Sequence, residues 1–300
     1  MGAFDAQGAQ QLAISPGNLF RSLGAEVDST YYRLAETEGR EPVSRDAFSE
    51  RQSCLPDIWL NSSLAMPPEF QCVSVQEGYE RWAQTYDNTP NPLLALEERH
   101  LIPFLPDLKG RRVLDLACGT GRWLARLLAR GASAGVGVDV SASMLRVAAT
   151  KSAITGRLVL ADCLQLPLRP SVFDFVLCSF ALNHIQKLGV MARELARVMR
   201  SEGQILISEL HPEAYARGWR PGFRDLRSAV QVESMPRSSE HVVECFQSHF
   251  FACMKLYTFF FGEPERTIFL EQGKEKIFAY ACRVPAVQIY HFRKFDSASG

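Results

Sequence analysis

The segment VLDLACGTGRW, residues 113–123, constrains the fold of this chain more than any other stretch. Four apolar residues enclose an acid, Asp115, and a turn with Gly119 and Gly121 follows directly. An apolar helix-forming run comes next, so the pattern predicts a buried strand, a glycine-rich turn and a helix. Two glycines so close behind a buried strand favour the close approach of a ligand to the turn backbone.

Short apolar runs alternate with helix-like stretches after residue 111. We expect strands over residues 113–117, 134–140, 157–162, 173–182 and 204–210. Helices are expected between them over residues 121–131, 141–151 and 187–203, and elsewhere over 78–88, 90–105 and 240–254. This alternation predicts a parallel sheet with helices on both faces. With two closing strands, 255–263 and 286–294, the fold class is α/β, a doubly wound, mostly parallel seven-stranded sheet.

The chain is expected to have two parts. Residues 1–75 are polar and irregular, and we interpret them as an N-terminal extension that serves as a cap or a homo-oligomerisation arm. Residues 76–300 form the α/β domain. Within it, residues 211–240 read as an insert that begins with a loop rich in Gly, Pro and Arg.

Composition excludes several classes of protein. The 33 basic and 33 acidic residues balance, which argues against nucleic-acid binding through bulk charge. No apolar run reaches the roughly 20 residues that span a bilayer, and the opening MGAFDAQGAQ lacks signal-peptide character. The eight cysteines form neither a CxxC pair nor a Cys/His metal spacing. We therefore expect a cytoplasmic protein with no membrane, nucleic-acid or metal partner.

The glycine turn allows three readings. A P-loop requires G-x-x-x-x-G-K-[ST], and no Lys followed by Ser or Thr comes after this turn. A dinucleotide site requires G-x-G-x-x-G, but Leu124 stands in place of the third glycine. The carboxylate of Asp115 would repel a pyrophosphate and attract an ammonium group. A small molecule that joins an amino-acid end to an adenosine is S-adenosylmethionine (SAM).

On these residues, DLACGTG resembles the first motif of the class I SAM-dependent methyltransferases, small-molecule type, over residues 76–294. The resemblance implies a Rossmann-like core, SAM as cofactor and S-adenosylhomocysteine (SAH) as product. It also implies methyl transfer to a small-molecule acceptor by in-line displacement, with residues 211–240 on the acceptor side. Such a transfer depends mainly on positioning, and it needs a base only when the acceptor must lose a proton.

Further residues follow from the resemblance. Asp139 would bind the ribose hydroxyls, and Asp162 would accept from the adenine amino group. Tyr79 and Tyr86, with Trp82 on the same helical face, resemble the family's lid. The whole implied cofactor set is Tyr79, Tyr86, Asp115, Ala117, Cys118, Gly119, Thr120, Gly121, Asp139, Val140, Met144, Asp162, Cys163, Leu164, Ser179 and Phe180. Other roles stay open: Asp139 as a helix cap, Asp162 as a loop acid, and Met144 and the lid face as packing residues.

Two histidines are candidate catalytic bases because each follows an expected strand. His184 lies in FALNHI and His211 in SELHPE, where Glu209 could orient it. Each could instead form only local loop hydrogen bonds. The insert carries four arginines that either clamp an anionic acceptor group or lie in solvent: Arg217, Arg220, Arg224 and Arg227.

Two rival functions remain open at this stage. One is a SAM-binding scaffold, regulator or non-methylating SAM enzyme, because methyl transfer has no obligatory catalytic residue. The other, an NAD-type oxidoreductase, is disfavoured by the missing third glycine and by Asp115. The sequence leaves the acceptor and the methylated atom, oxygen, nitrogen or carbon, undetermined.

Overall fold

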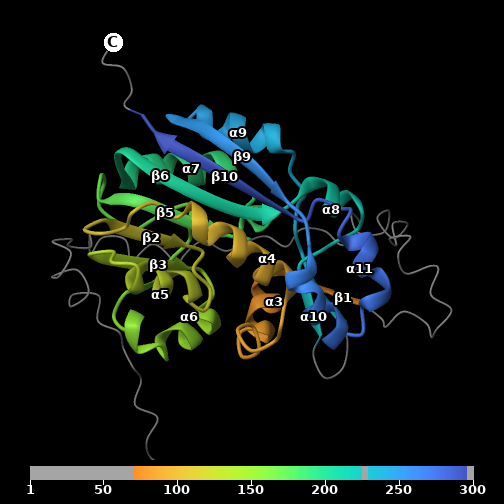
Figure 1. Cartoon of the computed structure of the whole chain (residues 1–300). Helices are drawn as coiled ribbons and strands as arrows, with labels where there is room; N and C mark the ends of the chain where they lie inside the picture. Colours follow the sequence, from red (N-terminus) through yellow and green to blue (C-terminus); the bar gives the residue numbers. More distant parts are fainter. Residues whose placement is uncertain (1–69, 225–228, 296–300) are drawn as a thin grey trace, which may run out of the picture.

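A computed structural model describes residues 70–224 and 229–295 of the chain (Figure 1). Its main sheet has seven strands in the order β4-β3-β2-β5-β6-β10-β9. They are β2 (Arg112–Leu116), β3 (Ala134–Asp139), β4 (Leu158–Leu160), β5 (Phe173–Ser179), β6 (Met199–Leu210), β9 (Phe251–Phe259) and β10 (Val287–Lys294). Only β10 runs antiparallel to its neighbours β6 and β9. The expected mostly parallel, seven-stranded sheet is confirmed.

Helices cover both faces of the sheet, as Figure 1 shows. One core packs against α4 (Pro92–Leu101), α5 (Arg122–Ala129), α6 (Ala142–Ala149), α10 (Glu263–Glu271) and α11 (Glu275–Ala281). The opposite core packs against α7 (Leu188–Val198) and α9 (Ser239–Gln247). Strand alternation explains the division: Val113 enters the first core, and Leu114 enters the second.

Two expected helices end earlier than their sequence patterns suggest. The helix expected to reach residue 203 ends at Val198, and β6 begins at Met199. The helix expected over residues 240–254 ends at Gln247, where a turn with Phe250 in the left-handed region leads into β9. In both places the residues continue an apolar helical pattern, but they form backbone hydrogen bonds within the sheet instead of extending the helix.

A second, three-stranded sheet was not expected from the sequence. It consists of β1 (Phe70–Val73), β8 (Ala229–Val232) and β7 (Gly222–Arg224), in that order. The helix α3 (Val75–Trp82) packs on β8 so closely that a methyl group added at Gly78 would lie 2.6 Å from Val232 Cγ2. We call β1, α3, β7 and β8 the cap. The cap thus joins segments from residues 70–82 and 222–232, which are far apart in the sequence.

Some expectations concern residues that lie outside the described part of the chain. They include residues 1–69, most of the expected extension and oligomerisation arm, and Arg227 of the insert. Within the described residues, no helix combines the length and apolar character needed to cross a membrane.

Candidate active site

The two glycines of the turn after β2 have different surroundings. Both have left-handed backbones, with φ of 54° at Gly119 and 73° at Gly121. A methyl group added at Gly119 would meet no atom within 4 Å, whereas at Gly121 it would lie 2.3 Å from Ile154 Cδ1. Gly121 therefore serves the packing of α5, and Gly119 leaves its backbone open to a ligand.

Asp115 occupies a different place from the one expected. Strand alternation turns its side chain toward α5, where it is 1% exposed and its Oδ2 accepts a hydrogen bond from Leu124 N at 2.8 Å. Leu124 is the third residue of α5, and the N-cap residue Gly121 has no side chain to accept that bond. Asp115 thus caps the helix from the neighbouring strand. This capping role was not expected from the sequence, and the contact of Asp115 with a ligand ammonium stays a prediction.

Replacing Asp115 with Asn should change how stability depends on pH. Burial raises the pKa of Asp115 from 3.8 to about 7, so the native chain retains a proton that the unfolded chain releases over this range. The stability that this proton confers is present at low pH and is lost as the pH rises. Across that window, the unfolding free energy of wild type should fall by on the order of 4 kcal/mol more than that of Asp115→Asn. Denaturant unfolding at several pH values measures this, and parallel curves would contradict it.

Two further acids lie at carboxyl ends of strands, as expected. Asp139 ends β3, where its Oδ2 accepts from Gly119 N at 2.7 Å and its Oδ1 from Ser141 N at 2.8 Å. Asp139 therefore supports the glycine turn and the start of α6 together. Asp162 is exposed beyond the end of β4, and its Oδ1 accepts from Leu164 N at 2.9 Å. Parallel strands bring both carboxylates to the edge of the sheet that carries Gly119.

Other members of the expected cofactor set divide between open and buried positions. Val140, directly after Asp139, is 68% exposed. Cys163 and Leu164 are half-buried and pack against the core on the side of the sheet that α7 and α9 cover. Met144 is 2% exposed within a cluster that includes Trp82 and Val232 of the cap. Cys118 is buried against β3, where a methyl group added at Gly137 would meet its Sγ at 2.8 Å. Met144 and Cys118 therefore pack within the protein, and their contacts with the cofactor stay predictions.

A buried polar network lies beside the turn. Glu97 of α4, which is 0% exposed, pairs with Arg122, the first residue of α5. Ser179, at the end of β5, donates to Glu97 Oε1 at 2.6 Å and accepts from Arg122 Nη2 at 3.2 Å. Ser208 of β6 donates to the same Glu97 oxygen. The sequence analysis named Ser179 as a cofactor residue but did not anticipate its partners Glu97 and Arg122. A charged residue within an amphipathic helix gives no signal in the sequence that it points inward.

A second polar cluster ties the turn to the segment that follows the cap helix. Thr120 Oγ1 donates to Asp87 Oδ1 at 2.6 Å, and Lys151 Nζ donates to Asp87 Oδ2 at 2.6 Å. Lys151 also donates to the Thr120 carbonyl. Thr120, which we expect to contact the cofactor, thus donates a hydrogen bond to Asp87. The sequence analysis did not anticipate Asp87. This cluster holds the neighbouring Tyr86 close to the glycine turn.

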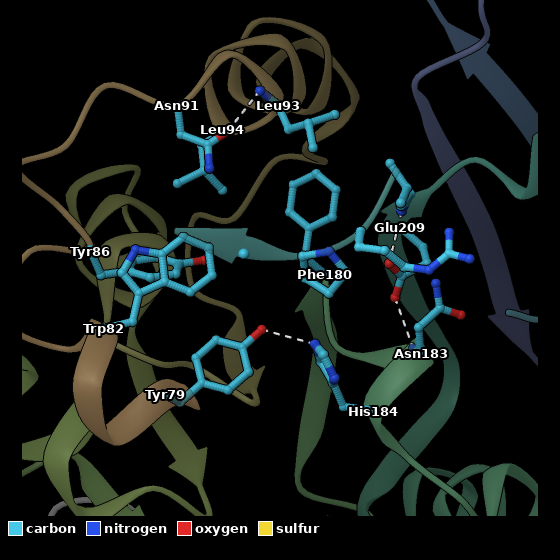
Figure 2. Close-up of a pocket in the computed structure, with 14 residues that line it drawn as sticks. Tyr79, Trp82, Tyr86, Asn91, Leu93, Leu94, Phe180, Asn183, His184 and Glu209 are labelled. Atoms are coloured by element: carbon cyan, nitrogen blue, oxygen red, sulfur yellow. Dashed lines mark hydrogen bonds between the residues drawn. The ribbon is translucent and has the colours of Figure 1, made fainter. Parts of the chain in front are cut away.

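A pocket of about 560 Å³, counting its open mouth, lies between the cap and the ends of β5 and β6 (Figure 2). In Figure 2, the rings of Tyr79, Trp82 and Tyr86 face Phe180 and Glu209 across this space. Phe180 has a left-handed backbone, with φ of 50°, as does Ala117 after β2. Such strain in non-glycine residues is common at functional sites. The lining residues are Tyr79, Trp82, Tyr86, Asn91, Leu93, Leu94, Phe180, Asn183, His184, Glu209, Leu210, Arg220, Pro221 and Gly222.

His184 and Tyr79 form a hydrogen-bonded pair in this pocket. The Tyr79 hydroxyl lies 2.9 Å from His184 Nε2, and His184 Nδ1 lies 2.8 Å from the Glu233 carbonyl oxygen. Because a carbonyl can only accept, Nδ1 carries the proton, and Nε2 accepts from Tyr79. Burial lowers the pKa of His184, which favours the neutral imidazole. The pair therefore presents a basic nitrogen with a fixed tautomer.

His211 has a different setting. It is the N-cap residue of α8 (Pro212–Ala216), and its Nδ1 accepts from Glu213 N at 3.1 Å. It does not line the pocket. Glu209 accepts from the backbone N–H groups of Leu210 and Asn183 and so does not orient His211 as expected. The structure thus assigns His211 a capping role and leaves His184 as the histidine of the pocket.

Fold and site together define a Rossmann-like α/β protein with an open glycine turn and acids at successive strand ends. A family model for a methyltransferase domain matches residues 114–207. A demethylmenaquinone methyltransferase of Tropheryma whipplei is 30% identical over 185 residues, which cover 58% of this chain and 76% of that protein. The chain belongs to the class I SAM-dependent methyltransferases, whose cofactor is SAM.

The chain is also similar to two other proteins, one in sequence and one in fold. An uncharacterized protein of Haemophilus influenzae is 32% identical over 126 residues, 39% of this chain and about half, 49%, of that protein. The fold matches the crystal structure of an S-adenosylmethionine-dependent methyltransferase from Listeria monocytogenes, described as putative, with a TM-score of 0.54 and 20% identity. That match covers 68% of this chain and all of the other.

Proposed function

We propose that the protein transfers the methyl group of SAM to a small-molecule acceptor by in-line displacement. The single observation that carries this proposal is the Tyr79–His184 pair, which faces the pocket between the cap and the ends of β5 and β6. Aromatic and apolar side chains with a few polar groups line this pocket, as is usual for a small-molecule site. SAM-dependent methyl transfer is the chemistry of the family; the choice of acceptor class rests on the pocket.

The residues at the strand ends fit the expected cofactor. The open backbone of Gly119 would admit the ligand, and the carboxylates of Asp139 and Asp162 would accept hydrogen bonds from its ribose and its adenine. When bound, SAM supplies an electrophilic methyl group on a positively charged sulfur. Aromatic rings such as Tyr79, Trp82 and Tyr86 stabilise a nearby cation and exclude water.

The role of His184 follows from its protonation. An acceptor that must lose a proton can pass it to the neutral imidazole through Tyr79, because the lone pair of His184 Nε2 already accepts the Tyr79 hydroxyl hydrogen. The Tyr79 hydroxyl, which donates to Nε2, can hand over its own proton as it receives the acceptor's. Hydrogen bonds thus orient the imidazole of His184, which stays neutral until it receives the proton.

Methyl transfer is tested by SAH formation with acceptors of different chemistry. The panel should contain phenols, carboxylic acids and amines, together with demethylmenaquinone, on which the Tropheryma whipplei relative is named to act. SAH formation with any member supports transfer to a small molecule. SAM binding without product across the panel would favour the rival function, a SAM-binding scaffold or regulator.

The ribose role of Asp139 gives a separate prediction. Asp139→Ala should weaken SAH binding by roughly 1–3 kcal/mol, the cost of ligand hydroxyls left without their partner. Because Asp139 also holds Gly119 N and Ser141 N, a control must separate turn support from ligand contact. Calorimetry with an SAH analogue that lacks both ribose hydroxyls provides it, because the substitution should weaken that analogue less. Equal losses for the two ligands would exclude a ribose contact.

A further inference from the structure

Glu209 is a buried carboxylate that faces the pocket from the end of β6. It is 7% exposed, and it lines the same space as Phe180 and His184 (Figure 2). Oε1 accepts from Leu210 N at 2.8 Å, and Oε2 accepts from Asn183 N at 3.1 Å. Both oxygens thus accept hydrogen bonds from backbone donors. This geometry favours the ionised form, in which both oxygens only accept hydrogen bonds.

Nearby cations are committed to other partners. Arg237 donates to the carbonyl oxygens of Leu182, Ile185 and Gln186. Arg220, which also lines the pocket, donates to the carbonyl oxygens of Tyr215 and Trp219. Among the described residues, neither makes a direct ion pair with Glu209, although the nearby charge of Arg237 acts to lower the pKa of Glu209. A buried carboxylate without a paired cation is costly unless a ligand compensates it.

The aromatic lining of the pocket favours the same kind of ligand. Tyr79 and Trp82 of α3, with Tyr86 of the segment that follows it, form a mutually contacting set on one side of the pocket, with ring centroids 5.0–6.5 Å apart. Such rings attract cations through their faces. Burial raises the pKa of Glu209 to about 7, and a cation beside it would favour the ionised form.

We propose that Glu209 is the specificity-determining residue of the acceptor site, and that it selects acceptors with a protonated amino group over anionic ones. This inference rests on the proposed function, since it names the acceptor class of the same pocket. A carboxylic acid or phosphate would meet the Glu209 charge at close range and would be repelled. A neutral alcohol of the same shape would donate one hydrogen bond without the ionic attraction.

Amine methylation is chemically balanced in this pocket. The ammonium proton passes to the Tyr79 oxygen as the Tyr79 proton passes to His184 Nε2, which frees the nitrogen lone pair. The nitrogen then forms the bond to the methyl carbon, and the electron pair of the broken carbon–sulfur bond stays on sulfur. The products are the methylated amine and SAH, with one proton left on His184.

Calorimetric titration of the full chain, saturated with SAH, tests the selection. Three probes share one aromatic frame and differ in charge: phenethylamine, 2-phenylethanol and phenylacetate. Above the Glu209 pKa of about 7, wild type should bind phenethylamine at least about tenfold more tightly than phenylacetate, equivalent to about 1.4 kcal/mol. Phenylacetate binding as tightly as phenethylamine would overturn the inference.

Glu209→Gln should remove most of the amine preference while retaining SAH affinity. The control is Glu213→Gln, on the exposed side of α8, which should leave the preference unchanged. Thermal unfolding shows whether Glu209→Gln folds; if it does not, the order of the three probes on wild type decides alone. A folded Glu209→Gln with an unchanged amine preference would contradict the role of Glu209. Failure of SAH itself to bind wild type would instead contradict the proposed function.

Discussion

Gly119→Val is expected to abolish the binding of SAM and SAH, with a loss of affinity of about a hundredfold or more, about 2.7 kcal/mol. The reason is steric. Gly119 N points at Asp139, its φ is 54°, and the space on its Cβ side is open. A valine there would place two methyl groups where we expect the ligand to approach the backbone. Isothermal titration calorimetry with SAH measures the loss.

Gly110→Val is the matched control for this substitution. Gly110 also has a positive φ, 76°, and a methyl group added there meets no atom within 4 Å. It precedes β2, at the opposite end of the strand from Gly119. Both variants should lose roughly 1–2 kcal/mol of stability from the left-handed backbone, and only Gly119→Val should lose the ligand. Wild-type SAH affinity in Gly119→Val would show that the ligand does not approach this turn.

His184→Ala is expected to lower the turnover number by about a hundredfold or more, the scale of general base catalysis. SAH affinity should be unchanged, because we assign His184 to the acceptor proton and not to the cofactor. Burial lowers the pKa of the histidine, so the wild-type rate should rise with pH in the acidic range and level off once the imidazole is neutral. This acidic limb should disappear in the variant. The rate of SAH formation against pH, with the best acceptor of the panel, measures both effects.

Two controls separate a base from a packing residue. Tyr79→Phe keeps the ring but removes the hydroxyl that relays the acceptor's proton, so it should lower the rate. It frees Nε2 to take the proton directly, so the loss should be smaller than in His184→Ala and the acidic limb should remain. His211→Ala removes a histidine that caps α8 outside the pocket, so its rate should match that of wild type. An unchanged rate in His184→Ala would reduce His184 to a structural residue.

The sequence predicted the strand ends well because strand and turn signals are local. Continuous apolar runs located β2, β3 and β5, and the carboxylates Asp139 and Asp162 lie where those patterns placed them. Parallel topology then brings them to one edge without further information. The edge of the sheet that we assign to the cofactor could therefore be anticipated from the sequence alone.

The rest depends on contacts between distant segments. The sequence located Asp115 at the end of a strand but did not predict that it caps α5. That role depends on two facts: the N-cap residue Gly121 has no side chain to accept a hydrogen bond, and Asp115 lies on the strand face that packs on α5. Glu97 gave no signal within its helix, although it is fully buried. The cap was missed because β1 pairs with β8, more than 150 residues later in the chain, across a loop-like insert.

Asp87 has a kinetic consequence. Its carboxylate holds both Thr120 of the glycine turn and Lys151, so the segment after α3 is fastened to the turn that we assign to the cofactor. We expect the exchange of spent SAH for fresh SAM to displace this segment and so to break these contacts in every cycle. Since Asp87 and Lys151 are partly open to water, added salt weakens their attraction. Product departure, and with it steady-state turnover, should therefore become faster as ionic strength increases.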